Sequence, residues 1–172
     1  MRIGVISLGC AKNLVDTEVL LGKLKAGGAK LVNDPKRADV LIINTCGFIE
    51  PAKVEAIETI LEFAGKKKVI VMGCLAQRYK EELQREIPEV SAYFGTESWN
   101  EIVKFLGLEN KESKRVLTTP KSYAYLKISE GCNRLCSFCA IPLIRGRHRT
   151  RPMEEVLEEA KYLADQGVKE LC

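Results

Sequence analysis

Short apolar runs alternate with helix-like segments over about the first hundred residues of this chain. Apolar runs predict strands at residues 2–8, 30–32, 40–43, 69–72 and 90–94. Apolar side chains at helical spacing predict helices at residues 13–26, 50–63, 75–87 and 99–106. Strands and helices in the order βαββαβαβα pair through right-handed crossovers, so we predict an α/β fold with a doubly wound parallel sheet.

A polar stretch, residues 109–115, separates this region from the rest of the chain and contains no apolar side chain. That composition is typical of a linker, although a solvated turn within one domain has the same composition. We therefore predict a first domain over residues 1–108, a linker over 109–121 and a second domain over 122–172.

The second domain carries the pattern of one strand–helix–strand unit. It consists of a predicted strand at residues 123–128, a helix at 153–164 and the start of another strand at 168–171. One such unit cannot close a sheet or a barrel. We therefore expect this chain to be the N-terminal part of a longer protein.

Composition excludes several protein classes. With 46% apolar and 29% charged residues, the chain is neither fibrous nor largely disordered. Its apolar runs are far shorter than the roughly 18 residues of a membrane span, and its N-terminus lacks the apolar segment of a secretory signal. We expect a cytoplasmic protein without membrane contact. The net charge of +4 is too small to indicate nucleic-acid binding, so direct RNA binding stays open.

Three of the seven cysteines form the motif Cys132-x3-Cys136-x2-Cys139, directly after a predicted strand. Clustered cysteines in a reducing compartment are more typical of metal sites than of disulfides. Three thiolates suit an iron–sulfur cluster and leave one iron of a four-iron cluster without a protein ligand. Zinc is the alternative, because His148 is available as a fourth ligand.

The other informative cysteines are Cys10, Cys46 and Cys74, each of which follows a predicted parallel strand. The carboxyl ends of parallel strands lie at one edge of the sheet, where open α/β sheets bind ligands. A single cysteine at a strand end is more typical of a small buried residue. Three at equivalent strand ends predict a second cluster site at that edge.

Polar residues beside both sets of cysteines have two interpretations each. Asn13, Asp16 and Asn44 either orient the metal ligands or cap helices and turns. The segment Arg145–Arg151 has five basic side chains in seven residues. It either contacts a nucleotide, an acidic substrate or ribosomal RNA, or forms a solvated basic loop.

The motif Cys132-x3-Cys136-x2-Cys139, with Phe138 before its last cysteine, resembles the radical S-adenosylmethionine (SAM) superfamily. The resemblance implies that these three cysteines hold a four-iron, four-sulfur (4Fe–4S) cluster whose open iron binds SAM. It also implies that an electron, from a reductant such as flavodoxin or ferredoxin, cleaves SAM to a 5′-deoxyadenosyl radical.

The segments around Cys10, Cys46 and Cys74 resemble the N-terminal domain of the methylthiotransferases within that superfamily. The resemblance implies a second 4Fe–4S cluster on these cysteines, whose open iron holds the sulfur to be inserted. Residues 9–16 and 86–90 are more similar to the RimO type, which modifies an aspartate of a small-subunit ribosomal protein, than to MiaB-type tRNA enzymes.

Together these resemblances imply a radical SAM methylthiotransferase with two 4Fe–4S clusters and SAM. It inserts a methylthio group at the β-carbon of an aspartate, and no catalytic side chain is predicted. They also imply that the second domain is the start of a truncated radical SAM (β/α) barrel. A tRNA methylthiotransferase and a non-enzymatic metal-binding protein are the alternatives. We expect the 172-residue chain by itself to be inactive, because most of the barrel is missing.

Overall fold

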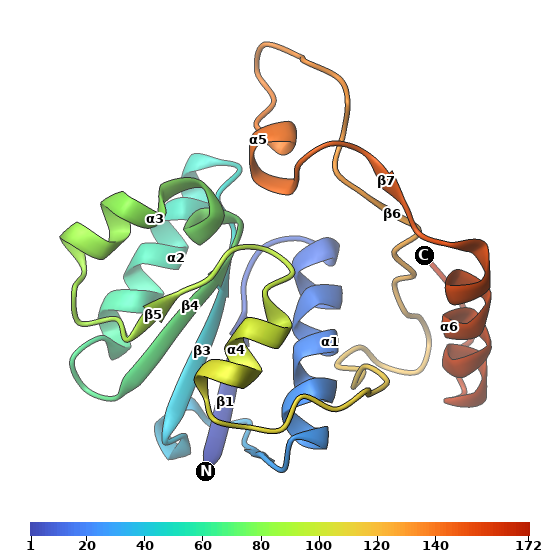
Figure 1. Cartoon of the computed structure of the whole chain (residues 1–172), viewed down its shortest axis with the longest axis horizontal. Coiled ribbons are helices and arrows are strands. Elements are labelled where there is room, and N and C mark those ends of the chain that lie inside the picture. Colours follow the sequence, from blue (N-terminus) through green and yellow to red (C-terminus); the bar gives the residue numbers. More distant parts are fainter. The chain divides into compact units, whose positions relative to one another are not determined.

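The computed structural model describes all 172 residues and divides into two compact units, Met1–Val116 and Leu117–Cys172 (Figure 1). The first unit contains a central sheet with helices, and the second contains shorter elements around the motif Cys132–Cys139. None of the helices has the length and apolar character needed to cross a membrane.

A five-stranded parallel sheet forms the centre of the first unit. The strands are hydrogen-bonded in the order β2-β1-β3-β4-β5, and every pairing is parallel. This confirms the parallel sheet predicted from the apolar runs. The strands are β1 (Arg2–Ser7), β2 (Lys30–Leu31), β3 (Val40–Thr45), β4 (Lys68–Gly73) and β5 (Ala92–Tyr93).

Helices cover both faces of this sheet, so the sheet is doubly wound as predicted (Figure 1). Leu20 and Leu24 of α1 pack with Ile102 of α4 on one face, and Ile60 of α2 packs with Leu83 of α3 on the other. The predicted order βαββαβαβα is confirmed. The helices are α1 (Ala11–Ala26), α2 (Glu50–Phe63), α3 (Cys74–Glu86) and α4 (Trp99–Phe105), with a 3-10 turn, η1 (Pro35–Arg37), before β3.

Strand β3 is buried along its whole length because both of its faces are covered. Val40 and Ile42 pack in the core cluster that contains α1 and α4, whereas Leu41 and Ile43 pack in the cluster that contains α2 and α3. Successive side chains of a strand point to opposite faces, so a strand covered on both faces needs a continuous apolar run. This is the pattern from which β3 was predicted.

The chain runs from β1 to one side of the sheet and from β3 to the other. From β1 it passes through α1 to the edge strand β2, and from β3 it passes through α2 to β4. A reversal of this kind opens a crevice at the carboxyl ends of the two strands, where open α/β sheets bind ligands. The fold therefore favours a ligand site at the ends of β1 and β3.

Tyr93 connects β5 to the end of α3. Its hydroxyl donates to the carbonyl oxygens of Leu83 (3.1 Å) and Ile87 (2.9 Å). Burial, with a smaller effect from Glu89, raises the pKa of Tyr93 to about 12. The folded state therefore favours the neutral phenol over the phenolate.

We expect Tyr93→Phe to lower the free energy of unfolding by about 1 kcal/mol at pH 8, because a buried hydrogen bond is lost. The ordinary pKa of tyrosine is about 10, so the wild-type advantage is complete below pH 10 and is lost as the pH rises towards 12. Urea unfolding of both proteins at pH 8 and pH 11 tests this. An advantage that grows with pH would contradict it.

The second unit contains one short antiparallel pair and one parallel bridge. Ala124 and Leu171 form the bridge on either side of α6, which gives the predicted strand–helix–strand unit in a minimal form. The regular strand predicted at residues 123–128 is wrong, because Ala124 is the one residue of this segment that forms a bridge. The named elements are β6 (Ser129–Glu130), α5 (Ile141–Arg145), β7 (Arg149–Thr150) and α6 (Met153–Asp165), and β6 pairs with β7.

The boundary between the units falls inside the predicted linker. Residues 109–116 belong to the first unit, where the N–H of Val116 donates to the carbonyl oxygen of Glu18 in α1 (3.0 Å). The side chains of Glu18 and Arg115 are buried and 3.7 Å apart. A Cβ atom on Gly22 would lie 2.2 Å from the carbonyl oxygen of Lys114, so α1 accepts this segment only because residue 22 is glycine. The polar composition of the segment did not predict these contacts.

Candidate functional site

Cys10, Cys46 and Cys74 lie at the same edge of the parallel sheet. They follow β1, β3 and β4, which are neighbouring parallel strands, within three residues of each strand end. The register pairs Ser7 with Asn44 and Thr45 with Gly73, so the three strands end level with one another. The structure therefore places the three cysteines where the strand pattern predicts them, at the crevice of the β1–β3 reversal.

Glycines bring the three cysteine segments close to one another. A Cβ atom on Gly9 would lie 2.7 Å from the Cβ atom of Cys46, and one on Gly47 would lie 2.8 Å from the Cα atom of Leu75. Gly9 also has a φ of +93°, a conformation that glycine adopts without strain. Only glycine at these positions permits the observed approach of the chain segments that carry the cysteines.

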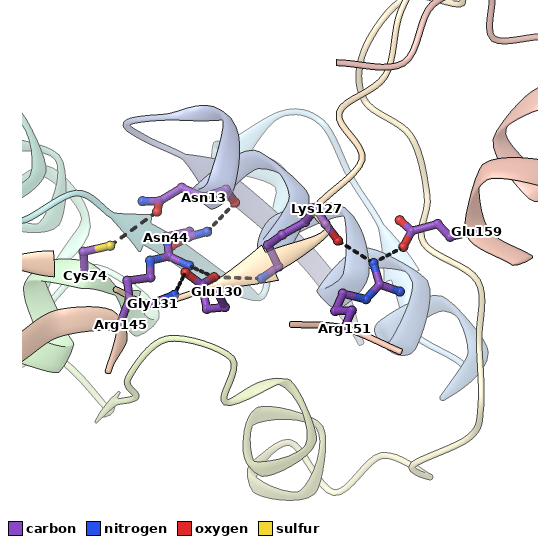
Figure 2. A network of polar contacts seen from close by, with 9 residues as sticks. All are labelled: Asn13, Asn44, Cys74, Lys127, Glu130, Gly131, Arg145, Arg151 and Glu159. Atoms are coloured by element: carbon purple, nitrogen blue, oxygen red, sulfur yellow. Dashed lines mark hydrogen bonds and ion pairs between the residues drawn. The ribbon is translucent and has the colours of Figure 1, made fainter. Parts of the chain in front are cut away.

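Asn13, in the first turn of α1, contacts all three segments and is completely buried. Figure 2 shows its contact with Cys74. Its Nδ2 atom donates to the carbonyl oxygens of Leu8 and Thr45, both at 3.0 Å. Its Oδ1 atom accepts a hydrogen bond from the Sγ atom of Cys74 at 3.5 Å. One side chain thus joins the ends of β1 and β3 to the cysteine that follows β4.

Asn44 extends this hydrogen-bond network to Thr17 and Ser7. Its Nδ2 atom donates to the carbonyl oxygen of Asn13 (2.8 Å) and to the hydroxyl of Thr17 (3.0 Å), which lies 2.9 Å from the hydroxyl of Ser7. The N-cap of α1 is Cys10, without a side-chain cap. Neither Asn13 nor Asn44 caps α1, and both side chains connect strand ends to this helix. Asp16 is buried in the same helix.

The cysteines at this edge form no disulfide, and their exposures differ. Cys46 and Cys74 are buried at 9% and 7% exposure, whereas Cys10 is exposed. Across the chain, no three His, Cys, Asp or Glu side chains converge as metal ligands do. The strand ends thus place three thiols at the edge of the sheet where ligands bind, but the side chains do not converge as a ligand set in this structure. Three thiols are also the donor set of an iron–sulfur cluster with one open iron.

The other three cysteines lie in the loop between β6 and α5. The N–H of Cys139 donates to the carbonyl oxygen of Cys136 (3.0 Å), and the N–H of Arg134 donates to the Sγ atom of Cys132 (3.4 Å). Leu135 and Phe138 are 91% and 86% exposed. This loop therefore presents its cysteines together with two large apolar side chains on an open surface.

A buried ion cluster closes the base of this loop (Figure 2). The carboxylate of Glu130 lies 2.9 Å from Arg145 Nη1 and 3.1 Å from Lys127 Nζ, and it accepts from the N–H of Gly131 (3.0 Å). The N–H of Cys132 donates to the carbonyl oxygen of Gly146 (3.1 Å). These contacts therefore connect the residues at the start of the cysteine loop to those at its end.

The ion cluster controls the protonation state of Glu130. Burial by itself raises the pKa of this carboxyl group, but the charges of Arg145 and Lys127 and the N–H of Gly131 outweigh it. The net result is a pKa of about 2. The supporting role of Glu130 was not predicted from the sequence. The available signal was its position directly before Gly131 and Cys132.

The basic segment after the loop is not uniformly solvated. Arg145 is buried against Glu130, and Arg151 pairs with Glu159 and donates to the carbonyl oxygen of Lys127 (2.8 Å). These two arginines therefore have structural partners, which the solvated-loop interpretation did not include. The exposed members of the segment are Arg147, His148 and Arg149.

The structure does not bring His148, the proposed fourth zinc ligand, to the cysteines. Its Nε2 atom lies 3.4 Å from the hydroxyl of Thr150, and its backbone N–H donates to the side chain of Asn133 (3.0 Å). The loop thus supplies three thiols without this histidine, and three thiols are the donor set expected for a cluster with one exposed iron.

Two protein-family models match the chain. Residues 2–95 match the model described as "Uncharacterized protein family UPF0004", and residues 126–172 match the model of the "Radical SAM superfamily". The chain belongs to the UPF0004 family. The UPF0004 match contains Cys10, Cys46 and Cys74, and the radical SAM match contains all three cysteines of the loop.

Relatives of this UPF0004 chain carry the name "Ribosomal protein uS12 methylthiotransferase RimO". The protein from Aquifex aeolicus (strain VF5) is 74% identical over 100% of the chain. Those from Sulfurihydrogenibium sp. (strain YO3AOP1) and Flavobacterium johnsoniae are 56% and 50% identical over 99% of it. The chain spans 40%, 41% and 42% of the length of these three relatives.

These matches confirm the resemblance inferred from the cysteine motifs. A UPF0004 domain followed by a radical SAM segment is the domain order that the motifs predict. The radical SAM match also implies SAM and iron–sulfur chemistry.

Proposed function

We propose that this UPF0004 chain supplies the N-terminal domain and the first barrel elements of a radical SAM methylthiotransferase. Its target is the β-carbon of an aspartate in a small-subunit ribosomal protein. When bound, two 4Fe–4S clusters and SAM supply the sulfur, the methyl group and the radical for this substitution. The names of the relatives support the reaction and the substrate class.

The observation that carries the proposal is the presence of two separate sets of three thiols in one chain. Cleavage of SAM to a radical requires only the loop with Cys132, Cys136 and Cys139. A second set at the sheet edge, Cys10, Cys46 and Cys74, gives the enzyme a place to hold sulfur apart from SAM. A transferase that inserts sulfur needs both sites.

The protein's own residues bind and orient these groups. Cys10, Cys46 and Cys74 would hold one cluster at the sheet edge of the first unit, and the loop cysteines would hold the other in the second unit. The ion pair of Glu130 and Arg145 keeps the ends of the loop together. Leu135 and Phe138 lie between the cysteines of this loop and are exposed, so they are apolar side chains that the remaining part of the enzyme would cover.

Iron and acid-labile sulfide per chain after anaerobic reconstitution test the two-cluster proposal. We expect about eight irons in the wild-type chain and about four in each of Cys10→Ala and Cys132→Ala. Cys172→Ala is the matched control, because Cys172 is an exposed thiol outside both sets, and it should leave the iron content unchanged. About four irons that are insensitive to Cys10→Ala, or one zinc in place of iron, would contradict the proposal.

The substrate requires an enzyme of the full length of the relatives. We expect such an enzyme, with SAM and a reductant of the flavodoxin or ferredoxin type, to add a methylthio group to a peptide of the ribosomal protein. Mass spectrometry detects the product, and a tRNA substrate offered in parallel should stay unmodified. Modified tRNA with an unmodified peptide would favour the tRNA alternative. The proposal places the enzyme in the cytoplasm, where thiols stay reduced.

A further inference from the structure

Among the buried polar side chains of the first unit, Asn13 contacts all three segments that carry the strand-edge cysteines. Asn13 is completely buried in the first turn of α1. Asparagine is a poor helix former compared with alanine or leucine, and burial of its amide costs free energy unless the polar atoms are bonded. An apolar residue would serve the helix and the core better, so the amide has another role.

The hydrogen bonds of the amide show which role it has. Both N–H groups are available on Nδ2, and this atom donates to the carbonyl oxygens of Leu8 and Thr45. Oδ1 accepts from the thiol of Cys74. These partners belong to the three segments that carry the strand-edge cysteines. Only a short side chain with two donors and one acceptor makes all three contacts from one position.

Asn13 lies where the backbone hydrogen bonds between β1 and β3 end. The last backbone hydrogen bond from β1 towards β3 at this edge is donated by Leu8 to Asn44 (2.9 Å). Beyond it, the carbonyl oxygen of Leu8 bonds to the side chain of Asn13, which also holds Thr45. The amide thus continues the connection between β1 and β3 beyond the last backbone hydrogen bond. It joins Leu8, two residues before Cys10, to Thr45, directly before Cys46.

We infer that Asn13 is a positioning residue, which fixes the distances between the three cysteine segments before a cluster binds. The inference rests on the proposed function, because it assumes a cluster at this edge. Asn13 sets the backbone next to Cys10 and Cys46 through its donors, and it orients the side chain of Cys74 through its acceptor. It does not ligate iron.

The test uses the 172-residue chain with Cys132, Cys136 and Cys139 replaced by alanine, so that only the strand-edge site binds iron. After reconstitution, the transfer of iron to a chelator is timed, and the melting temperature of the metal-free chain is measured. We expect Asn13→Ala to speed up iron release by about 10–100-fold, the usual effect of removing a group that orients metal ligands.

Thr17→Val is the matched control. It removes a buried hydroxyl of the same network, whose hydrogen-bond partners Ser7 and Asn44 lie within β1 and β3, one residue before the carbonyl groups that Asn13 contacts. We expect it to lower the melting temperature of the metal-free chain about as much as Asn13→Ala does, with iron release unchanged. Equal iron release from the two variants would overturn the inference, because general destabilisation would then explain the effect.

Asn13→Asp replaces Asn13→Ala if the alanine variant does not fold. Aspartate keeps the size of the side chain and suits the first turn of a helix, yet it lacks both N–H donors. The same acceleration of iron release is expected, and wild-type release from this variant would overturn the inference. A parent chain that binds no iron would instead overturn the proposed function, and the inference with it.

Discussion

Gly73→Ala is expected to lower the free energy of unfolding of the first unit by about 3–4 kcal/mol. Gly73 has a φ of +98°, and a Cβ atom there would lie 2.3 Å from Oδ1 of Asn44 and 2.6 Å from the carbonyl oxygen of Thr45. The positive φ costs an L-residue about 1–2 kcal/mol, and forced overpacking costs about 1–3 kcal/mol. Both costs apply at this position, directly before Cys74.

Gly28→Ala provides the matched control for backbone strain. Gly28 has a φ of +88°, but a Cβ atom there would have no atom within 4 Å. We expect this variant to lose only about 1 kcal/mol, from the positive φ. Urea unfolding followed by the fluorescence of Trp99 measures both variants in the same unit. Equal losses of unfolding free energy in the two variants would contradict the prediction, because the ends of β3 and β4 would then have shifted to make room for the Cβ atom.

The same substitution should also affect iron binding. Gly73→Ala pushes the end of β4 away from Asn44 and Thr45, and therefore moves Cys74 relative to Cys46. We expect the strand-edge site to retain less than half of its iron, whereas Gly28→Ala retains all of it. The site with Cys132 provides an internal reference within the same chain.

The second large effect is expected at Glu130. Glu130→Ala should destabilise the second unit by about 3–5 kcal/mol, because it leaves the buried cations Arg145 and Lys127 without their shared carboxylate. Glu155→Gln is the control in the same unit. Glu155 is exposed and lies 3.9 Å from Arg151, so its replacement should have no measurable effect.

The effect of Glu130 should depend on pH in a defined direction. Its pKa lies at about 2 in the folded chain, below the ordinary value of 4.5. The charged carboxylate therefore stabilises the fold fully above about pH 4.5, and this stabilisation is lost as the pH falls towards 2. Urea unfolding followed by NMR signals of the second unit at pH 7 and pH 3 should show the wild-type advantage over Glu130→Ala shrinking in acid. A constant advantage would contradict the ion cluster.

Much of the first unit was predictable because local patterns decide it. The run Val40–Ile43 is apolar on both alternating faces, which only a strand covered on both sides requires. Helix α2 begins and ends at the predicted residues, with Pro51 in its first turn, where a missing N–H costs nothing. The cysteines after β1, β3 and β4 needed only the parallel order to reach one edge.

The elements that the sequence did not reveal depend on partners far along the chain. Residues 123–128 read as a strand, but their pairing depends on residues 170–172, which reach only Ala124 and Leu126. The polar segment 109–115 predicted a linker over residues 109–121, but its contacts with Glu18 and Gly22 belong to the first unit. No pattern among neighbouring residues in the sequence indicates either of these long-range contacts.

The sequence by itself thus determined the parallel sheet, the order of its helices and the two sets of cysteines, because hydrophobic periodicity and motif spacing are local properties. Only the tertiary structure decided how each cysteine set is supported. Asn13 reaches Thr45, 32 residues away, and Arg145 reaches Glu130, 15 residues away. Buried polar side chains obtain their role from whichever partners folding brings within hydrogen-bond distance, and residue type alone does not specify those partners.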